Sequence, residues 1–456
     1  MKHTLTLIFT CCLIFIFTIF TGCDNNSDDE EPVGNDVAQE RVSDSCEGCH
    51  TNYDVLKTVY TPDPPSTGGG GCGGDAPHYE PYDRVYLSGA GYEDFKNDIH
   101  GKLGCVTCHN GVDHTADKDL AHSGDFISHP SQDAESKCGN CHPSIFNRAH
   151  NSIHAQGWGQ KNMVVSRAGL DSFNQLSEMM KEGYTTNCGK CHASCGDCHI
   201  NRPIAGGGGL YNGHKFNKTP DMRDHCTTCH VSRGGHAYYG IAPGTVPDIH
   251  LTGAGYTCLD CHTTNEIHGD GEEYNQRYKM PLLPKCENCH TNLADANEYH
   301  TAHLNTFNCQ TCHSQDYNNC GSCHIGSTEG ARIHSHQDFH IGMNPIPETK
   351  PYKYALLRQS LSAPDSWQDY GIANLENFSV APTYKYTTPH NIQRWTTRTE
   401  VEEGKPCYDA CHIIKEEDVY RNIELYLFRS DLEDWEVDAD VNIVVDGHLP
   451  AAWNVQ

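Results

Sequence analysis

The sequence predicts a mostly irregular fold with a few α-helices and a small β element near the C-terminus, built around something other than its own side chains. Only 37% of its 456 residues are hydrophobic, which is too few to form a large core in a chain of this length. Its 42 glycines and 22 prolines interrupt most helical and alternating patterns. Its 26 cysteines and 31 histidines recur together in one short motif.

The motif C-x-x-C-H is typical of covalent haem c attachment, and every C-x-x-C pair in the chain is followed by His. The two thiols bind the haem vinyl groups, and the His is the proximal iron ligand. Neither a disulfide framework nor a zinc ribbon requires the following His. The cysteines are Cys46, Cys49, Cys105, Cys108, Cys138, Cys141, Cys188, Cys191, Cys195, Cys198, Cys226, Cys229, Cys258, Cys261, Cys286, Cys289, Cys309, Cys312, Cys320 and Cys323. The proximal histidines are His50, His109, His142, His192, His199, His230, His262, His290, His313 and His324. These motifs predict ten haems and a haem-cored fold.

A stretched motif with one additional residue predicts an eleventh haem. It consists of Cys407, Cys411 and the adjacent His412. The alternative is a local disulfide beside an unrelated His. Outside these motifs and the N-terminal region one cysteine remains, Cys72 in a glycine-rich stretch. It is either a free thiol, an intermolecular bridge, a metal ligand or a residue without a role.

The remaining histidines are numerous enough to give every iron a second axial His. Two imidazoles favour low-spin iron of low potential, whereas a Met ligand raises the potential. Candidates for the distal position lie shortly upstream of a motif or in loop-like stretches: His100, His122, His129, His154, His214, His250, His268, His300, His303 and His390. His78 is a further candidate. His334, His336 and His340 form a cluster from which one distal ligand could come, and we name His340 as that candidate.

The N-terminal segment predicts export and a lipid anchor. A short cationic start precedes the apolar run of residues 5–21, and Phe20-Thr21-Gly22-Cys23 resembles a lipoprotein cleavage site. Residues 1–22 are then the signal peptide and Cys23 the lipidated residue, with an uncleaved anchor as the alternative. Residues 23–43 are acidic and predict a disordered tether. We expect the body to be held at the outer membrane, on its periplasmic or outer face.

Two parts follow the tether: a decahaem body over residues 44–330 and a C-terminal wrap over residues 331–456. Within the body, apolar spacing predicts one helix over residues 165–183. The wrap begins as extended chain over residues 331–406, and the runs NIELYLF and VNIVV predict the small β element.

Short gaps between motifs predict close haems and electron hopping. His192 and Cys195 are three residues apart, so their Cα atoms are at most about 11 Å apart. The formal charge of −28 argues against nucleic-acid binding and favours cationic partners or metal ions. Asp270, Glu272 and Glu273 could bind calcium, but a solvated acidic turn is the better interpretation of these residues.

The lipoprotein start and the motif series resemble the multihaem cytochromes that metal-reducing Gram-negative bacteria display at the outer membrane. Three stretches carry the likeness: HGDGEEYNQRY (268–278), FNCQTCHSQDYNNCGSCH (307–324) and PYKYALLRQ (351–359). The octahaem tetrathionate reductase and hydroxylamine oxidoreductase group is similar more distantly, with a different haem number and motif spacing. The resemblance implies electron exchange with other redox proteins, metal oxides or soluble metal ions.

Three functions fit these features. An electron-transfer conduit needs six-coordinate haems and no acid–base residue. A reductase of a small inorganic sulfur or nitrogen substrate needs one iron with an open axial position. A structural unit of a haem filament is the third. The sequence favours the conduit.

Overall fold

The computed structural model describes residues 44–64, 78–189, 192–230, 235–241, 244–317, 339–359, 364–453 and 455. Contacts divide the chain into residues 1–42 and a compact unit of residues 43–456. The signal peptide, the tether with Cys23, and the residues Cys72, Cys191, Cys320, Cys323, His324, His334 and His336 lie outside the described residues. No described helix has the length and apolar character needed to cross a membrane.

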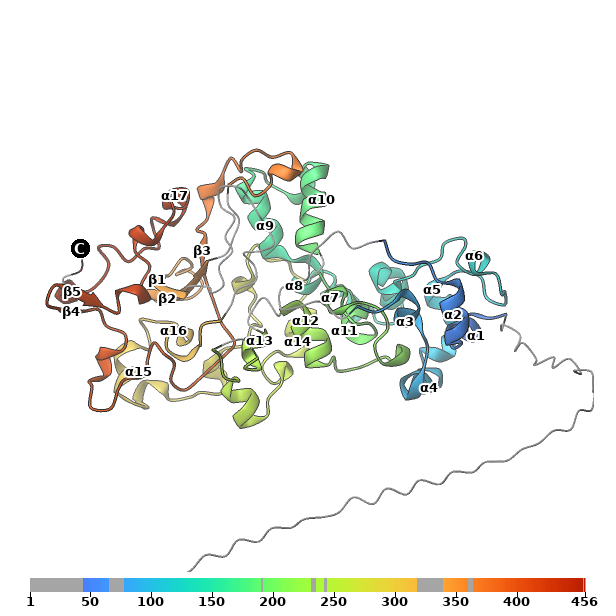
Figure 1. Ribbon diagram of the computed structural model, residues 1–456, viewed down its shortest axis with the longest axis horizontal. Helices are drawn as coiled ribbons and strands as arrows, with labels where there is room; N and C mark the ends of the chain where they lie inside the picture. The colour runs from blue at the N-terminus through green and yellow to red at the C-terminus, as the bar shows by residue number, and fades with distance from the viewer. Residues whose placement is uncertain are drawn as a thin grey trace, which may run out of the picture. The chain divides into compact units, whose positions relative to one another are not determined.

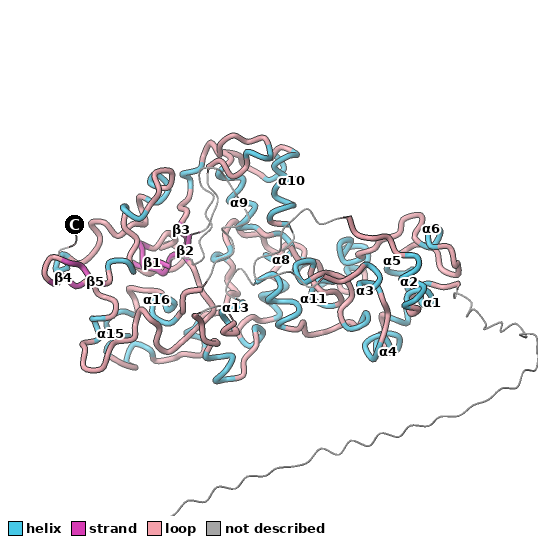
Figure 2. Tube along the Cα trace, viewed as in Figure 1, coloured by secondary structure: helices cyan, strands magenta, loops and turns pink. Residues whose placement is uncertain are grey.

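Short helices and turns dominate the compact unit (Figures 1 and 2). Among the described residues, none of the α-helices exceeds ten residues. Several of them coincide with a C-x-x-C-H motif, which begins the helix at its first Cys and ends it at its His. In the order of the chain the helices are α1 Cys46–His50, α2 Tyr53–Val59, α3 Pro81–Val85, α4 Gly89–Asn97, α5 Cys105–His109, α6 Lys118–Ala121, α7 Pro143–Ala149, α8 Ile153–Gln156, α9 Trp158–Arg167, α10 Glu178–Asn187, α11 Cys195–His199, α12 Thr227–His230, α13 Gly235–Tyr238, α14 Thr264–His268, α15 Glu298–His303, α16 Cys309–His313 and α17 Val437–Asp440.

The helix predicted over residues 165–183 is wrong, because the structure breaks it into α9, a short 3₁₀ turn and α10. Gly169 has φ +71°, and the Ser177 side chain caps a new helix by accepting a hydrogen bond from the Met180 amide. Because the turns keep the apolar side chains on one side, Leu176 and Met180 still pack in one cluster with Tyr184 and Trp367.

A three-stranded antiparallel sheet occupies part of the segment expected to be extended chain. It comprises β1 Phe339–Met343, β2 Tyr354–Gln359 and β3 Tyr384–Tyr386, in that order. Leu356 of β2 lies opposite Ile341, and Leu357 lies opposite Tyr386. Every residue of β2 is buried, because core clusters cover both faces of the sheet.

The predicted C-terminal β element is displaced from its expected position. The hairpin consists of β4 Ile414–Glu416 and β5 Val419–Arg421, and Glu417 and Asp418 form its turn with positive φ angles. The run NIELYLF instead forms a 3₁₀ turn followed by a single bridge from Tyr426 to Ile341, and VNIVV forms no strand. The apolar side chains of both runs pack in the buried clusters around the sheet. Burial therefore explains their β-like composition.

Buried apolar side chains are concentrated in the C-terminal part. Ten of the thirty buried apolar and aromatic residues precede residue 318, although that part contributes most of the described chain. Seventeen of the 22 large apolar residues that are exposed precede residue 300. The motif-bearing part therefore has little side-chain core, and it presents the apolar surface that a large planar apolar group would cover.

Candidate haem-binding sites

Nine motif histidines each have one non-motif histidine across from them. The ring centroids of these pairs are 5.9 to 6.3 Å apart. All nine partners belong to the ten distal candidates named from the sequence. The pairs, with the motif histidine first, are His50 and His122, His109 and His214, His142 and His100, His199 and His268, His230 and His154, His262 and His390, His290 and His250, His313 and His300, and His412 and His303.

This separation fits an iron between two imidazoles. Two metal–nitrogen bonds of about 2 Å each, together with the radius of each ring, place the ring centroids roughly 6 Å apart. Imidazoles in direct stacking contact would be closer than this. The residues present therefore fit a haem held by two axial histidines at each of the nine positions, with the motif thiols beside it.

The hydrogen bonds of these histidines leave Nε2 available for iron. The Nδ1 atoms of His109 and His199 are 2.8 and 2.6 Å from backbone carbonyl oxygens. A partner on Nδ1 fixes the tautomer and the ring orientation of a metal-binding His. Nδ1 atoms of further paired histidines have carbonyl or carboxylate partners in the same way: His50, His100, His122, His250, His262, His303, His313 and His390.

Burial keeps several of these imidazoles in the neutral form that binds metal. It lowers the pKa of His214 and of His390 to about 4, in both cases because the charged form loses its hydration. Burial also lowers the pKa of His50, His109 and His154. At neutral pH these side chains carry a free electron pair for iron.

Thiols of different motifs lie next to one another, in most cases motifs that follow one another in the chain. Side-chain hydrogen bonds join Cys138 to Cys195, Cys226 to Cys258 and Cys286 to Cys309. Elsewhere burial is the main cause that raises the pKa of a motif thiol, and the charge of a thiol from another motif raises it further. The pairs are Cys46 with Cys105, Cys108 with Cys141, Cys198 with Cys226, Cys261 with Cys289, and Cys312 with Cys411. These contacts connect nine of the motifs in one series that follows the order of the chain, passing from the third motif to the fifth and from the ninth to the stretched motif.

The stretched motif has the same surroundings as the regular motifs. The ring of His412 is 5.9 Å from that of His303, and Trp453 lies against its other side at 5.0 Å. The half-buried Cys411 is 3.8 Å from the hydroxyl of Tyr426, which donates to the Cys411 carbonyl. The geometry at His412 is therefore that of the C-x-x-C-H sites, despite the additional residue.

Three distal candidates have no histidine partner among the described residues. His129 lies close enough to His109 to lower its pKa, but the ring across from His109 is that of His214. His78 is exposed and pairs with Glu80 at 3.3 Å. His340 lies on β1 with its ring 5.8 Å from that of Tyr384.

The surroundings of His192 differ from those of the nine paired motif histidines. Its Nε2 is 3.0 Å from the hydroxyl of Tyr184 and 3.2 Å from the Oε1 of Gln160. Burial is the main cause that lowers the pKa of His192, and the charge of Lys161 lowers it further. The sequence analysis missed these three residues, because only the fold brings α9 and α10 to the fourth motif.

Acidic partners of the histidines were also missed, although the sequence carries a signal for two of them. Asp-Ile-His occurs at Asp98–His100 and again at Asp248–His250, shortly before a motif each time. In both copies the Asp side chain accepts hydrogen bonds from the amide of the His two residues later and faces its Nδ1. The acidic residue thus orients the imidazole.

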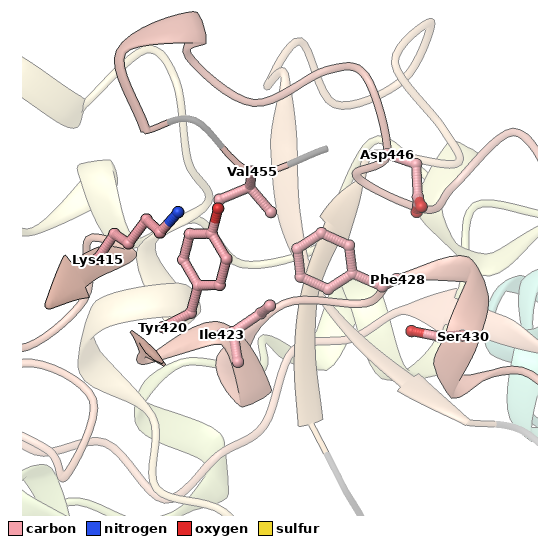
Figure 3. Close-up of a pocket in the computed structure, with 7 residues that line it drawn as sticks. All are labelled: Lys415, Tyr420, Ile423, Phe428, Ser430, Asp446 and Val455. Atoms are coloured by element: carbon pink, nitrogen blue, oxygen red, sulfur yellow. The ribbon is translucent and has the colours of Figure 1, made fainter. Parts of the chain in front are cut away.

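Within the described residues, no three His, Cys, Asp or Glu side chains gather to hold a metal ion by themselves. Around the expected calcium turn, Asp270 accepts hydrogen bonds from the Glu272 amide and the Tyr274 hydroxyl. A pocket beside the β4–β5 hairpin contains no motif residue (Figure 3). Its lining consists of Lys415, Tyr420, Ile423, Phe428, Ser430, Asp446 and Val455.

Comparisons with protein-family models, with curated proteins and with solved structures gave no match to this chain.

Proposed function

We propose that this protein is a multihaem c-type cytochrome that conducts electrons along a series of closely spaced, mostly bis-histidine haems. The observation that carries the proposal is the set of nine histidine pairs at 5.9 to 6.3 Å, each with a motif His on one side. Bound haem c supplies reversible one-electron chemistry at iron.

In this proposal the chain binds the irons, sets the distances between the haems and adjusts their reduction potentials. The contacts between thiols of different motifs favour neighbouring haem edges in van der Waals range. Electrons then pass along this series of sites, between that of His50 and that of His412. Carboxylate partners such as Asp248, 3.2 Å from the Nδ1 of His250, favour the oxidised state of their site because they stabilise positive charge.

The cellular setting belongs to the same proposal. Export followed by lipid attachment at Cys23 holds the haem body at the outer membrane. The acidic charge of the chain favours cationic surfaces, soluble metal ions or metal oxides and basic redox proteins as partners.

The test is intact-mass measurement of the exported protein, combined with a visible redox titration. We expect eleven covalently bound haems per chain, nearly all low-spin. A polypeptide with disulfides instead of haem would contradict the proposal. The three thiol pairs Cys138–Cys195, Cys226–Cys258 and Cys286–Cys309 are the places where such disulfides would form.

The second candidate, a reductase of a small inorganic sulfur or nitrogen compound, requires one iron with an exchangeable ligand. The observation behind this candidate is that, among the described motif histidines, His192 has no histidine ring opposite it. The two functions are compatible, because a conducting series can supply electrons to one such site.

A further inference from the structure

One buried carboxylate connects the segments that carry the distal histidines of the seventh and eighth sites. The Oδ1 of Asp248 accepts a hydrogen bond from the His250 amide at 2.7 Å and lies 3.2 Å from the Nδ1 of the same residue. Its Oδ2 accepts from the Ile392 amide at 2.6 Å, and that amide also donates to the His390 carbonyl at 3.0 Å. His250 faces the motif histidine of the eighth site, and His390 faces that of the seventh. The two oxygens of one side chain therefore reach both segments.

Further hydrogen bonds fasten the two segments together on either side of Asp248 in the chain. The Ile249 amide donates to the Ile392 carbonyl at 2.9 Å. The side-chain amide of Gln393 donates to the Pro247 carbonyl at 2.7 Å. The segments therefore lie side by side, and both distal histidines keep fixed positions relative to the carboxylate.

The charge of Asp248 acts on the seventh site as well as on His250. Burial lowers the pKa of His390 to about 4, and the charge of Asp248 acts against this effect. Burial raises the pKa of the Cys261 thiol in the seventh motif, and the charge of Asp248 raises it further. Water screens a buried charge poorly, so the effect of the charge extends beyond its direct hydrogen-bonding partners. The charge thus lies near ligands of both sites.

The other Asp-Ile-His copy in the chain reaches only one site. Asp98 makes the same two contacts with His100, at 2.9 Å to the amide and 2.7 Å to Nδ1. Among the described residues, the side-chain hydrogen bonds of Asp98 go to His100 alone. The side chain of Asp98 is 47% exposed, whereas that of Asp248 is 1% exposed. Water therefore screens the charge of Asp98, and its effect is confined to the site of His100 and His142.

We propose that Asp248 is a positioning residue shared by two haem sites, which lowers the reduction potentials of the seventh and eighth haems together. The inference rests on haem attachment at these two motifs, as in the proposed function. A carboxylate beside an axial imidazole stabilises oxidised iron, and one carboxylate between two such imidazoles stabilises both oxidised states. A charge that acted on one site alone would make electron transfer between these neighbouring haems uphill in one direction. A shared charge avoids this difference.

The experiment is a spectroelectrochemical titration of Asp248→Asn in the exported protein with all its haems. The amide removes the charge and keeps one oxygen, so it can accept a hydrogen bond on one side only. We expect two one-electron components to move to higher potential. Loss of a hydrogen bond to a charged group changes an equilibrium constant about tenfold, which is about 59 mV for each component.

Two control variants separate charge from position. Asp98→Asn removes the same group from the same three-residue motif and should move one component. Gln393→Ala removes a hydrogen bond that fastens the two segments but keeps the carboxylate, so it should move neither the seventh nor the eighth potential.

The seventh site is tested separately in a His250→Ala background. This change removes the imidazole through which Asp248 acts on the eighth haem. Carbon monoxide then binds the freed position of that iron and removes it from the titration. In this background Asp248→Asn should still raise the potential of one low-spin component.

Three results overturn the inference. The first is that one component or none moves in Asp248→Asn, which would limit the residue to one site at most. The second is a lost haem or a new carbon monoxide site in Asp248→Asn, which would mean that the residue holds ligands in place instead of setting potentials. The third is an equal upward shift in Gln393→Ala. All three leave the conducting function intact, whereas a chain without covalent haem would overturn the proposed function as well.

Discussion

Both carboxylate oxygens of Glu266 lie within hydrogen-bonding distance of the Nδ1 of His262, at 2.9 and 2.8 Å. Glu266 is buried on α14, and the ring of His390 lies 5.9 Å from that of His262 on the opposite side. A buried carboxylate on an axial imidazole increases its basicity, and thereby stabilises the oxidised state of a bound iron.

Glu266→Gln should therefore raise the potential of the haem at His262. Loss of one charge-assisted hydrogen bond corresponds to a shift on the order of 60 mV, about 1.4 kcal/mol for a one-electron couple. Spectroelectrochemical titration of the whole protein would resolve one component that moves upward. Glu376→Gln, at an exposed position, is the control and should move none. A downward shift would contradict the role of Glu266.

Replacing a histidine that faces a motif histidine should free one axial position of the iron between them. His300 faces His313 at 6.0 Å, so His300→Ala is expected to add one carbon monoxide per reduced chain and one high-spin haem. His129→Ala is the matched control, because the ring across from His109 is that of His214. If His129→Ala opened a haem and His300→Ala did not, the pairing in the structure would be wrong.

Removing the stretched motif should cost one haem. The double variant Cys407→Ala and Cys411→Ala is expected to lower the intact mass by one haem, because His412 faces His303 as a regular motif His would. Cys72→Ser, outside every motif, should leave the mass of bound haem unchanged. An unchanged haem number in the double variant would exclude the eleventh site.

Stability of the C-terminal part should depend on Asp440. Burial, together with the charge of Glu436, raises the pKa of Asp440 to about 6 despite hydrogen bonds from Thr383 and the Tyr384 amide. A carboxyl whose pKa is raised on folding stabilises the folded state when protonated. This stabilisation is present below the ordinary pKa near 4 and is lost as the pH rises through 6.

Asp440→Asn keeps an oxygen for the two amides and removes the charge. We expect it to unfold at higher denaturant concentration at pH 7, by about 1–2 kcal/mol, and to match the parent below pH 4. Asp438→Asn, exposed on the same helix α17, controls for the change in net charge. Burial lowers the pKa of Arg167, and the charge of Asp440 partly offsets this effect. A less stable Asp440→Asn at pH 7 would mean that attraction between Asp440 and Arg167 outweighs the burial of the Asp440 charge.

Much of the local structure could be predicted, and the errors have physical causes. The scarcity of long helices follows from the glycines and prolines, and the motifs mark where short helical turns begin. The helix over residues 165–183 was wrong because Gly169 and the cap at Ser177 break the backbone while the apolar pattern continues. The sheet of β1, β2 and β3 was missed because burial on both faces removes the alternation that identifies a strand.

The sequence by itself determined where the proposed haem sites lie, since two thiols and an imidazole must be neighbours in the chain to hold one ring. It also supplied the candidates for the second ligand. Only the tertiary structure decided which histidine faces which motif, because those ligands come from segments up to 128 residues away, as for His262 and His390. Packing of α9 also placed Gln160, 32 residues away in the chain, beside Tyr184 at His192.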